Sequence, residues 1–132
     1  MLVKSTRLMK NWDESTTQES GKGLKTSHAL VTYELSGDIE GESKLDYSMV
    51  YLPNSKTLFT GYELVSGAIN GSKGSFVLLH EGIFDASGAK MTVTIVADSG
   101  CDELEEIQGS GEIESDIKDP MKAYMTIDIA LP

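Results

Sequence analysis

The stretch INGSKGSFVLLHEGIF, residues 69–84, contains the strongest turn signal of the sequence and a polar residue, His80, at the end of an apolar run. Asn70–Gly71 is typical of a two-residue type I′ turn, which joins two antiparallel strands. Because the turn fixes which residues of the two strands are opposed, it places Gly61 opposite His80. Glu63 then lies one diagonal step from His80 on the same face of the hairpin.

Other turns in the same stretch would change this pairing. A two-residue turn at Gly71–Ser72 would place Glu63 directly opposite His80 and keep both on one face. A three-residue loop would put the two side chains on opposite faces. The shared face of Glu63 and His80 therefore depends on a two-residue turn.

Alternation of apolar and polar residues recurs along most of the chain. In residues 89–98, AKMTVTIVAD, the odd positions are apolar and most positions between them are polar, a period of two that indicates a half-buried strand. Residues 43–52 and 121–131 repeat the pattern, and Gly, Pro, Asn and Asp separate the runs. We expect eight strands, near residues 2–12, 24–36, 43–52, 56–67, 74–84, 89–98, 104–117 and 121–131.

Consecutive strands with short connections and no crossover helices predict an antiparallel meander, and closing the meander removes its exposed edges. The sequence therefore predicts an all-β fold, an eight-stranded antiparallel up-and-down barrel, in a single domain spanning residues 1–132. Residues 102–108, DELEEIQ, have good helix propensity and an acidic first turn, so we expect a helical turn there.

The charge of the chain limits its partners. Eleven Lys and Arg residues against 21 Asp and Glu residues give a net charge of −10, which repels phosphate backbones and anionic lipids. We expect no nucleic-acid partner, and no membrane partner because no apolar segment is long enough to span a bilayer. Cys101 is the only cysteine and the first residues contain no leader-like apolar run, so the expected location is the cytoplasm.

One face of the predicted hairpin combines small and polar residues with apolar ones. It carries Gly61 and Glu63 on one strand and Phe76, Leu78, His80 and Gly82 on the other. We interpret this face as the barrel interior, where glycines leave room for a ligand and polar groups are few. The other face is almost as apolar, so the reverse assignment and an oligomer interface on that face both stay open.

Glu63 and His80 are the candidate catalytic residues, because a buried carboxylate beside an imidazole can move a proton. The alternative is a satisfied polar pair that only fixes the strand register. Tyr47 and Tyr62 are further candidates, since their hydroxyl groups can bond to a ligand, although strand tyrosines often only pack. The ligand-binding candidates are Tyr47, Gly61, Tyr62, Glu63, Phe76, Leu78 and His80.

The two histidines, His28 and His80, lie on different predicted strands and have no clustered cysteines near them. A transition-metal site needs several such ligands close together. We therefore expect no metal and no cofactor.

Five motifs follow one another in the sequence: WDES at 12–15, SGDIEGES at 36–43, GYELVSGAINGSKGSF at 61–76, LLHEG at 78–82 and DSGCDELEEIQGSGEI at 98–113. In this order they resemble a family of small uncharacterised bacterial proteins, classed as a domain of unknown function with an allene oxide cyclase-like barrel.

The resemblance implies a calycin-type barrel and homo-oligomeric assembly, as in plant cyclases of similar fold, but it implies no reaction. The Glu and His of the family pattern match Glu63 and His80. The pattern usually has an Arg before its Gly-Ser-Phe element and a Thr after Ser-Gly, where this chain has Ser72–Lys73 and Cys101.

Three hypotheses from different classes follow. The first, which we favour, is a protein that binds a small, partly apolar or amphipathic molecule in the barrel near Glu63 and His80. The second is an isomerase or cyclase that uses the same two residues as acid and base. The third is a structural or oligomeric interaction module whose barrel is filled by side chains.

Overall fold

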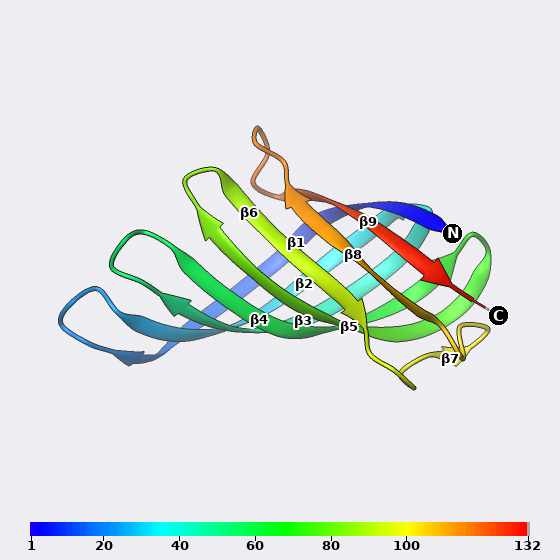
Figure 1. The fold of residues 1–132 in the computed structure, drawn as a ribbon, viewed down its shortest axis with the longest axis horizontal. Helices are drawn as coiled ribbons and strands as arrows, with labels where there is room; N and C mark the ends of the chain where they lie inside the picture. Colours follow the sequence, from blue (N-terminus) through cyan, green and yellow to red (C-terminus); the bar gives the residue numbers. More distant parts are fainter. Residues whose placement is uncertain (132) are drawn as a thin grey trace.

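The computed structural model describes residues 1–131, and every regular element in them is a β-strand (Figure 1). None of these residues forms a helix long and apolar enough to cross a membrane. The strands are β1 (Leu2–Glu19), β2 (Lys25–Gly37), β3 (Ile39–Tyr51), β4 (Thr57–Ile69), β5 (Ser72–Asp85), β6 (Gly88–Ile95), β7 (Cys101–Asp102), β8 (Gln108–Ser115) and β9 (Lys122–Ala130).

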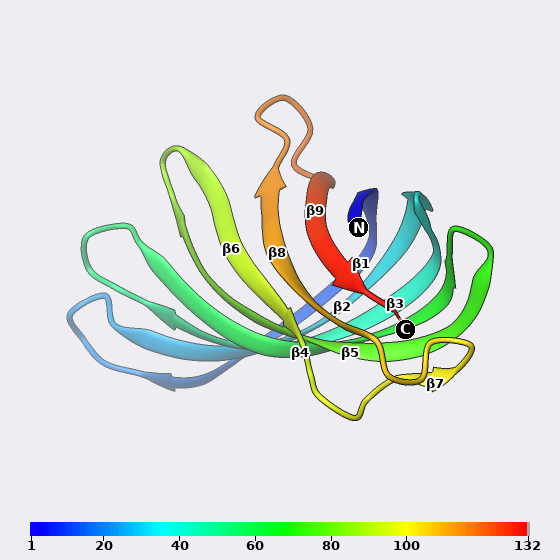
Figure 2. The same cartoon turned by 45° about the vertical axis from the view of Figure 1, so that its right-hand side comes forward.

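Eight of these strands form a closed ring. Their order is β4-β3-β2-β1-β9-β8-β6-β5, and the pairing of β4 with β5 closes it. All pairs are antiparallel, so the predicted eight-stranded up-and-down barrel is confirmed. Figure 2 shows the long strands bending around the interior, with β7 outside the ring beside the start of β5.

The β4–β5 hairpin has the register that the Asn70–Gly71 turn predicts. Both turn residues have positive φ, 48° at Asn70 and 90° at Gly71, as a type I′ turn requires. Gly61 is opposite His80, and Glu63 is opposite Leu78. Glu63 and His80 therefore share one face, one diagonal step apart, and neither alternative loop is present.

This shared face lies inside the barrel. Gly61, Glu63 and His80 are buried, whereas Tyr62 and Leu64 between and beside them are exposed. The interior residues are mostly aliphatic, but Arg7 is also buried among them. The interior assignment of the sequence analysis is therefore the correct one of the two that were open.

The barrel is closed at the end where the β4–β5 turn lies. Apolar side chains fill this end, and the segment between β6 and β8, which contains β7, adds two of them, Leu104 and Ile107, which are almost completely buried. The buried apolar residues of this half include Val3, Leu35, Ile39, Leu45, Val65, Ile69, Phe76, Leu78, Ile95, Ile127 and Ile129.

The predicted helical turn at residues 102–108 is not a helix. Hydrogen bonds from Leu104 N to Cys101 O and from Glu105 N to Asp102 O form successive tight turns. Asp102 and Glu106 have positive φ values of 59° and 69°, which a right-handed helix cannot contain. The burial of Leu104 at the barrel end outweighs the helix propensity of the acidic residues around it.

Several strand limits also differ from the predicted ones. β1 extends to Glu19 rather than to residue 12, because the long β1–β2 hairpin stays paired to its tip as far as Glu19 and Lys25. β3 begins at Ile39, and the segment predicted as 104–117 is a strand only from Gln108 to Ser115.

Gly61 and Gly82 do not leave space for a ligand, contrary to the expectation from the sequence. A Cβ atom on Gly61 would lie 2.1 Å from the carbonyl oxygen of Asp46, and one on Gly82 would lie 2.5 Å from the Cβ of Met91. The glycines allow β3 and β6 to approach their neighbours closely. Tyr47 and Met91 occupy the nearby space instead.

We predict that Gly61→Ala lowers the free energy of unfolding by about 1–3 kcal/mol, because the added methyl group must displace the β3 backbone. Urea unfolding at pH 7 measures this. Gly21→Ala is the matched control, since a Cβ atom there meets nothing within 4 Å and the change is expected to stay within about 0.5 kcal/mol. Equal effects of the two substitutions would contradict the close approach of β3 to Gly61.

Candidate functional site

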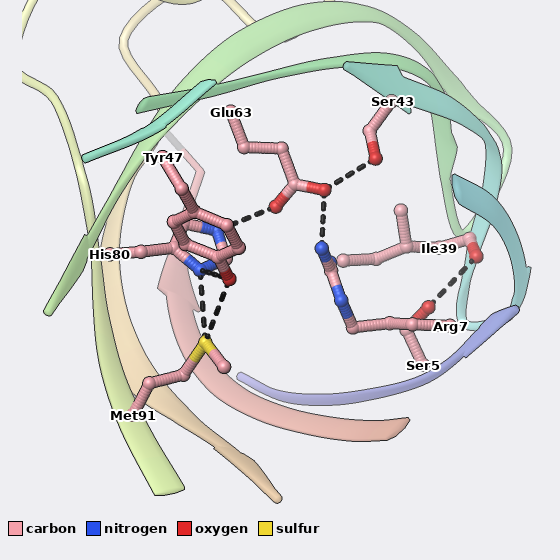
Figure 3. Close-up of polar contacts among 8 residues, drawn as sticks. All are labelled: Ser5, Arg7, Ile39, Ser43, Tyr47, Glu63, His80 and Met91. Carbon is pink, nitrogen blue, oxygen red and sulfur yellow. Dashed lines mark hydrogen bonds and ion pairs between the residues drawn. The ribbon is translucent and has the colours of Figure 1, made fainter. Parts of the chain in front are cut away.

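The interior contains a polar network centred on the carboxylate of Glu63, which lies on β4 and is completely buried (Figure 3). Glu63 Oε2 accepts hydrogen bonds from Arg7 Nη2 of β1 and from Ser43 Oγ of β3. Glu63 Oε1 is 2.7 Å from His80 Nε2 of β5. One carboxylate therefore connects four strands of the barrel across its interior.

Glu63 is an anion at neutral pH. Burial alone would raise its pKa, but the Arg7 guanidinium and the His80 hydrogen bond outweigh burial and lower the pKa from 4.5 to about 2. Burial likewise works to lower the pKa of Arg7, and the charge of Glu63 raises it above its ordinary value. Arg7 and Glu63 thus form an ion pair in which both side chains are almost fully inaccessible.

The hydrogen-bond polarity of His80 follows from this charge. An ionised carboxylate only accepts hydrogen bonds, so His80 Nε2 must carry a proton and donate it to Glu63. Burial lowers the pKa of His80, although Glu63 opposes this, so the imidazole is neutral near pH 7. Nδ1 is then an unprotonated acceptor, and it lies 3.5 Å from the hydroxyl of Tyr47 and 3.1 Å from Sδ of Met91.

Arg7 has a second contact that holds its guanidinium in place. Its Cζ lies 4.5 Å from the ring centroid of Tyr33, a cation–π arrangement. Nη2 binds Glu63, whereas Nη1 is buried without a hydrogen-bond partner among the described residues. The network is therefore satisfied at Glu63 and incompletely satisfied at Arg7.

A cavity of about 520 Å³ lies on the other side of this network, toward the end of the barrel where the β5–β6 and β8–β9 turns lie. Its walls within the barrel are mainly aromatic and sulfur-containing side chains, and residues of the two turns surround the mouth. The lining comprises Met9, Trp12, Tyr33, Tyr47, Met49, Tyr51, Thr57, Phe59, Met91, Ile113 and Ala123, and, nearer the mouth, residues 84–89, 115–117 and 120–122.

The cavity ends one layer above the network. Met9 and Met91 line it, whereas Arg7 and Val93, the next inward-facing residues of the same strands, do not. Tyr33 and Tyr47 also line the cavity and touch the network, through Arg7 and His80 respectively. These two tyrosines and the two methionines form the cavity floor: Met9, Tyr33, Tyr47 and Met91.

The aromatic wall near the mouth is held by a carboxylate. Glu14 accepts hydrogen bonds from Trp12 Nε1 at 3.0 Å, from Ser27 Oγ at 2.8 Å and from the Tyr51 hydroxyl at 2.5 Å. The Trp12 ring lies 6.2 Å from the ring of Tyr47, centroid to centroid. Trp12 and Tyr51 are therefore oriented by the two oxygens of one carboxylate, Oε1 and Oε2 respectively.

The structure brings together only part of the residue set that the sequence predicted. Glu63, His80, Tyr47 and Gly61 lie together in the interior, and of these only Tyr47 lines the cavity. Phe76 and Leu78 are buried below the network, in the filled half of the barrel, so they are core residues. Tyr62 points outward and is 59% exposed, on the face opposite to the other six.

Sequence reasoning missed Arg7, and one signal in the sequence points to it. Arg7 is the only arginine among the eleven basic residues of the chain, and Arg is the cation that pairs best with a buried carboxylate. The period-two pattern of β1 hides it, because apolar Leu2 and Leu8 on the outer phase compete with Val3 and Met9 on the inner phase. Sequence reasoning also missed most of the cavity lining, because its residues come from strands that are far apart in the sequence.

No group of three or more His, Cys, Asp or Glu side chains within residues 1–131 has an arrangement that could hold a metal ion. Cys101, the single cysteine, is exposed on β7 outside the ring.

We predict that removing the charge of either Arg7 or Glu63 lowers the free energy of unfolding, and that the two losses differ in size. Arg7→Met should lower the free energy of unfolding by about 3–5 kcal/mol, and Glu63→Gln by more, because Glu63 can become neutral by protonation whereas Arg7 cannot lose its charge. The double variant Arg7→Met/Glu63→Gln should cost clearly less than the sum of the single changes. Urea unfolding of the three variants measures this, and strictly additive losses would contradict a coupled buried pair.

The network also predicts a loss of stability in acid. The pKa of Glu63 is lowered from 4.5 to about 2, so its contribution, on the order of 3 kcal/mol, is present above pH 4.5 and lost as the pH falls through about 2. The pKa of His80 is also lowered, so below about pH 6.5 the unfolded chain takes up a proton that the folded protein resists. Stability should therefore already fall between pH 7 and pH 5.

Urea unfolding at pH 7, 6 and 5 checks the expected loss of stability that is attributed to His80. In His80→Gln an amide replaces the imidazole and does not titrate, so its stability should be flatter over this range than that of the unmodified protein. Parallel profiles would show that His80 is not responsible.

Comparisons with known proteins agree with this architecture. Residues 3–127 match a family model described as "Protein of unknown function (DUF3224)". The chain is also similar to a crystal structure of a protein with unknown function from the DUF3224 family of Shewanella oneidensis MR-1, with a TM-score of 0.77 and 18% sequence identity over 100% of this chain and 98% of that chain. At this identity the likeness shows the fold alone, and no curated protein matches the sequence. Since the family model spans nearly the whole chain, the protein belongs to the DUF3224 family.

Proposed function

We propose that this protein binds a small, partly apolar molecule in the cavity above the Arg7–Glu63–His80 network. The observation that carries the proposal is the cavity itself, about 520 Å³ in volume and lined mostly by aromatic, methionine and aliphatic side chains. Small-molecule sites in proteins are typically concave, largely apolar and a few hundred Å³ in volume. A structural module with a filled barrel needs no such space.

The aromatic residues of the wall support the proposal. Tyr47 packs against Phe59 with ring centroids 5.2 Å apart, and against Trp12 on another side. The hydrogen bond to Glu14 orients Trp12, and the rings of Trp12, Phe59 and His80 pack around Tyr47, so the wall is formed by contacts within the protein. A preformed wall reduces the entropy lost on binding and so favours affinity.

The enzyme alternative, an isomerase or cyclase, has one favourable observation. Glu63 orients His80 so that Nδ1 faces the cavity floor as a base. However, His80 is completely buried, and Met91 Sδ lies 3.1 Å from Nδ1 and covers it. A general base must approach within hydrogen-bond distance of the proton that it removes, so the arrangement favours binding over catalysis.

The fold alone does not decide between these functions. A closed eight-stranded barrel with one open end is what we expect of an allene oxide cyclase-like or calycin-type protein, and folds of this kind carry unrelated activities.

The outer face of β4 supports the proposal that the protein also self-associates. Leu58, Tyr62 and Leu64 are exposed apolar side chains on this one strand. Native mass spectrometry of the purified protein measures both the subunit number and any retained molecule.

We predict that filling the cavity abolishes binding. The probe is 1-octanol, a small amphipathic molecule without absorbance near 295 nm, and the readout is the emission of Trp12, the single tryptophan, which lines the cavity. Ala123→Phe should weaken the binding of 1-octanol at least about tenfold, because the ring enters the cavity from β9.

Ala130→Phe is the matched control, since Ala130 lies on the same strand, is exposed and faces outward. It should leave the affinity unchanged. Absence of saturable binding to the unmodified protein, or equal weakening by both substitutions, would refute the cavity as the binding site.

A further inference from the structure

We propose that the cavity floor, at the hydroxyl of Tyr47, accepts a hydrogen bond, and that the ligand is therefore an uncharged, largely apolar molecule with a hydroxyl or N–H group rather than a carboxylate. This inference rests on the proposed binding function and specifies the chemical class of its ligand. It follows from the direction of the hydrogen bonds that run from Glu63 to the cavity (Figure 3).

The direction is set at the buried end of the chain of contacts. Glu63 Oε2 already accepts from Arg7 and Ser43, and Oε1 faces His80 Nε2 at 2.7 Å. A carboxylate held by a guanidinium and a hydroxyl cannot donate, so the only proton available between Glu63 and His80 belongs to Nε2. The neutral imidazole then offers a bare Nδ1 on its other side.

The Tyr47 hydroxyl is the next group in this chain. It lies 3.5 Å from His80 Nδ1 and 3.4 Å from Met91 Sδ, and both of these atoms are acceptors. Burial raises the pKa of Tyr47 well above its ordinary value, so the hydroxyl keeps its proton. Whichever of the two atoms receives that proton, the proton is engaged by a neighbouring side chain and not by a ligand. What remains for a ligand is the lone pairs of the Tyr47 oxygen.

The charges around the cavity disfavour an anionic ligand as well. The positive charge of Arg7 is paired with Glu63 and covered on one side by the ring of Tyr33. At the mouth, Asp85 and Asp116 line the cavity together with one cation, Lys122. A carboxylate that entered would meet acidic groups at the mouth and lone pairs at Tyr47. Tyr33, the other floor tyrosine, can donate or accept and so imposes no direction.

Two isomeric probes test the direction of the hydrogen bond. 1-Octanol can donate and accept, whereas 1-methoxyheptane has the same atoms and only accepts. In Tyr47→Phe the acceptor oxygen is lost, so the affinity for 1-octanol should fall about tenfold, which corresponds to about 1.4 kcal/mol, while that for 1-methoxyheptane should not fall. For each probe, the affinity of Tyr47→Phe is compared with that of the unmodified protein. This ratio does not depend on the difference in hydration between the two probes. Tyr62→Phe, on the outer face, is the control and should change neither affinity.

Octanoate tests the second half of the proposal, and we expect it to bind at least about tenfold more weakly than 1-octanol to the unmodified protein. Equal losses of both neutral probes in Tyr47→Phe, or octanoate binding as tightly as 1-octanol, would overturn the assignment of an acceptor floor. If none of the three probes binds, or if Ala123→Phe does not weaken binding, the proposed function fails rather than this inference.

Discussion

The buried carboxylate of Glu63 is the constraint on which the interior of this barrel depends. An ionised group without contact to water requires hydrogen-bond donors and an opposite charge nearby. Ser43 and His80 supply donors from β3 and β5, the two neighbours of β4, whereas Arg7 of β1 reaches Glu63 across the interior of the closed barrel. The barrel therefore has to adopt one register across its diameter, and a slip of one residue in β4 would move Glu63 to the outside.

The network divides the interior into two halves with different properties. On one side aliphatic residues, with Leu104 and Ile107 from the segment between β6 and β8, fill the barrel. On the other side the inward positions carry aromatic and methionine residues that line a cavity. Tyr47 belongs to both parts, since it touches His80 below and Trp12 and Phe59 above. The network therefore contacts the cavity floor at three points: Arg7 lies against the ring of Tyr33, and His80 Nδ1 lies against the Tyr47 hydroxyl and against Met91 Sδ.

Turns and alternation within neighbouring strands predicted the barrel and part of the polar network. Contacts between strands that are far apart in the sheet could not be predicted from such local patterns. The Asn70–Gly71 turn fixed the register of β4 and β5, and so placed Glu63 beside His80 on the inner face. Arg7 could not be found in this way, because β1 lies three strands from β4 in the sheet and its contact with Glu63 forms across the barrel interior. The glycines were misread for a related reason: a missing side chain indicates that something approaches closely, but not whether that is a ligand or, as at Gly61, a neighbouring strand. Tyr62 was selected by residue type although the alternation of β4 places it outside.

Stability alone does not explain the buried network of Arg7, Glu63 and His80. Replacing a buried ion pair by well-packed apolar side chains is often neutral or stabilising, so the Arg7–Glu63 pair is weak evidence of a stabilising role. Arg7 Nη1 lacks a partner among the described residues, which adds a desolvation cost that an aliphatic residue would avoid. Well-packed apolar side chains at these positions would avoid that desolvation cost. What an apolar interior could not do is fix the proton on Nε2 of His80 and so leave an acceptor at Nδ1, and this property reaches the cavity through Tyr47. The cost of the network is therefore best understood as the cost of giving the cavity floor a defined hydrogen-bond polarity.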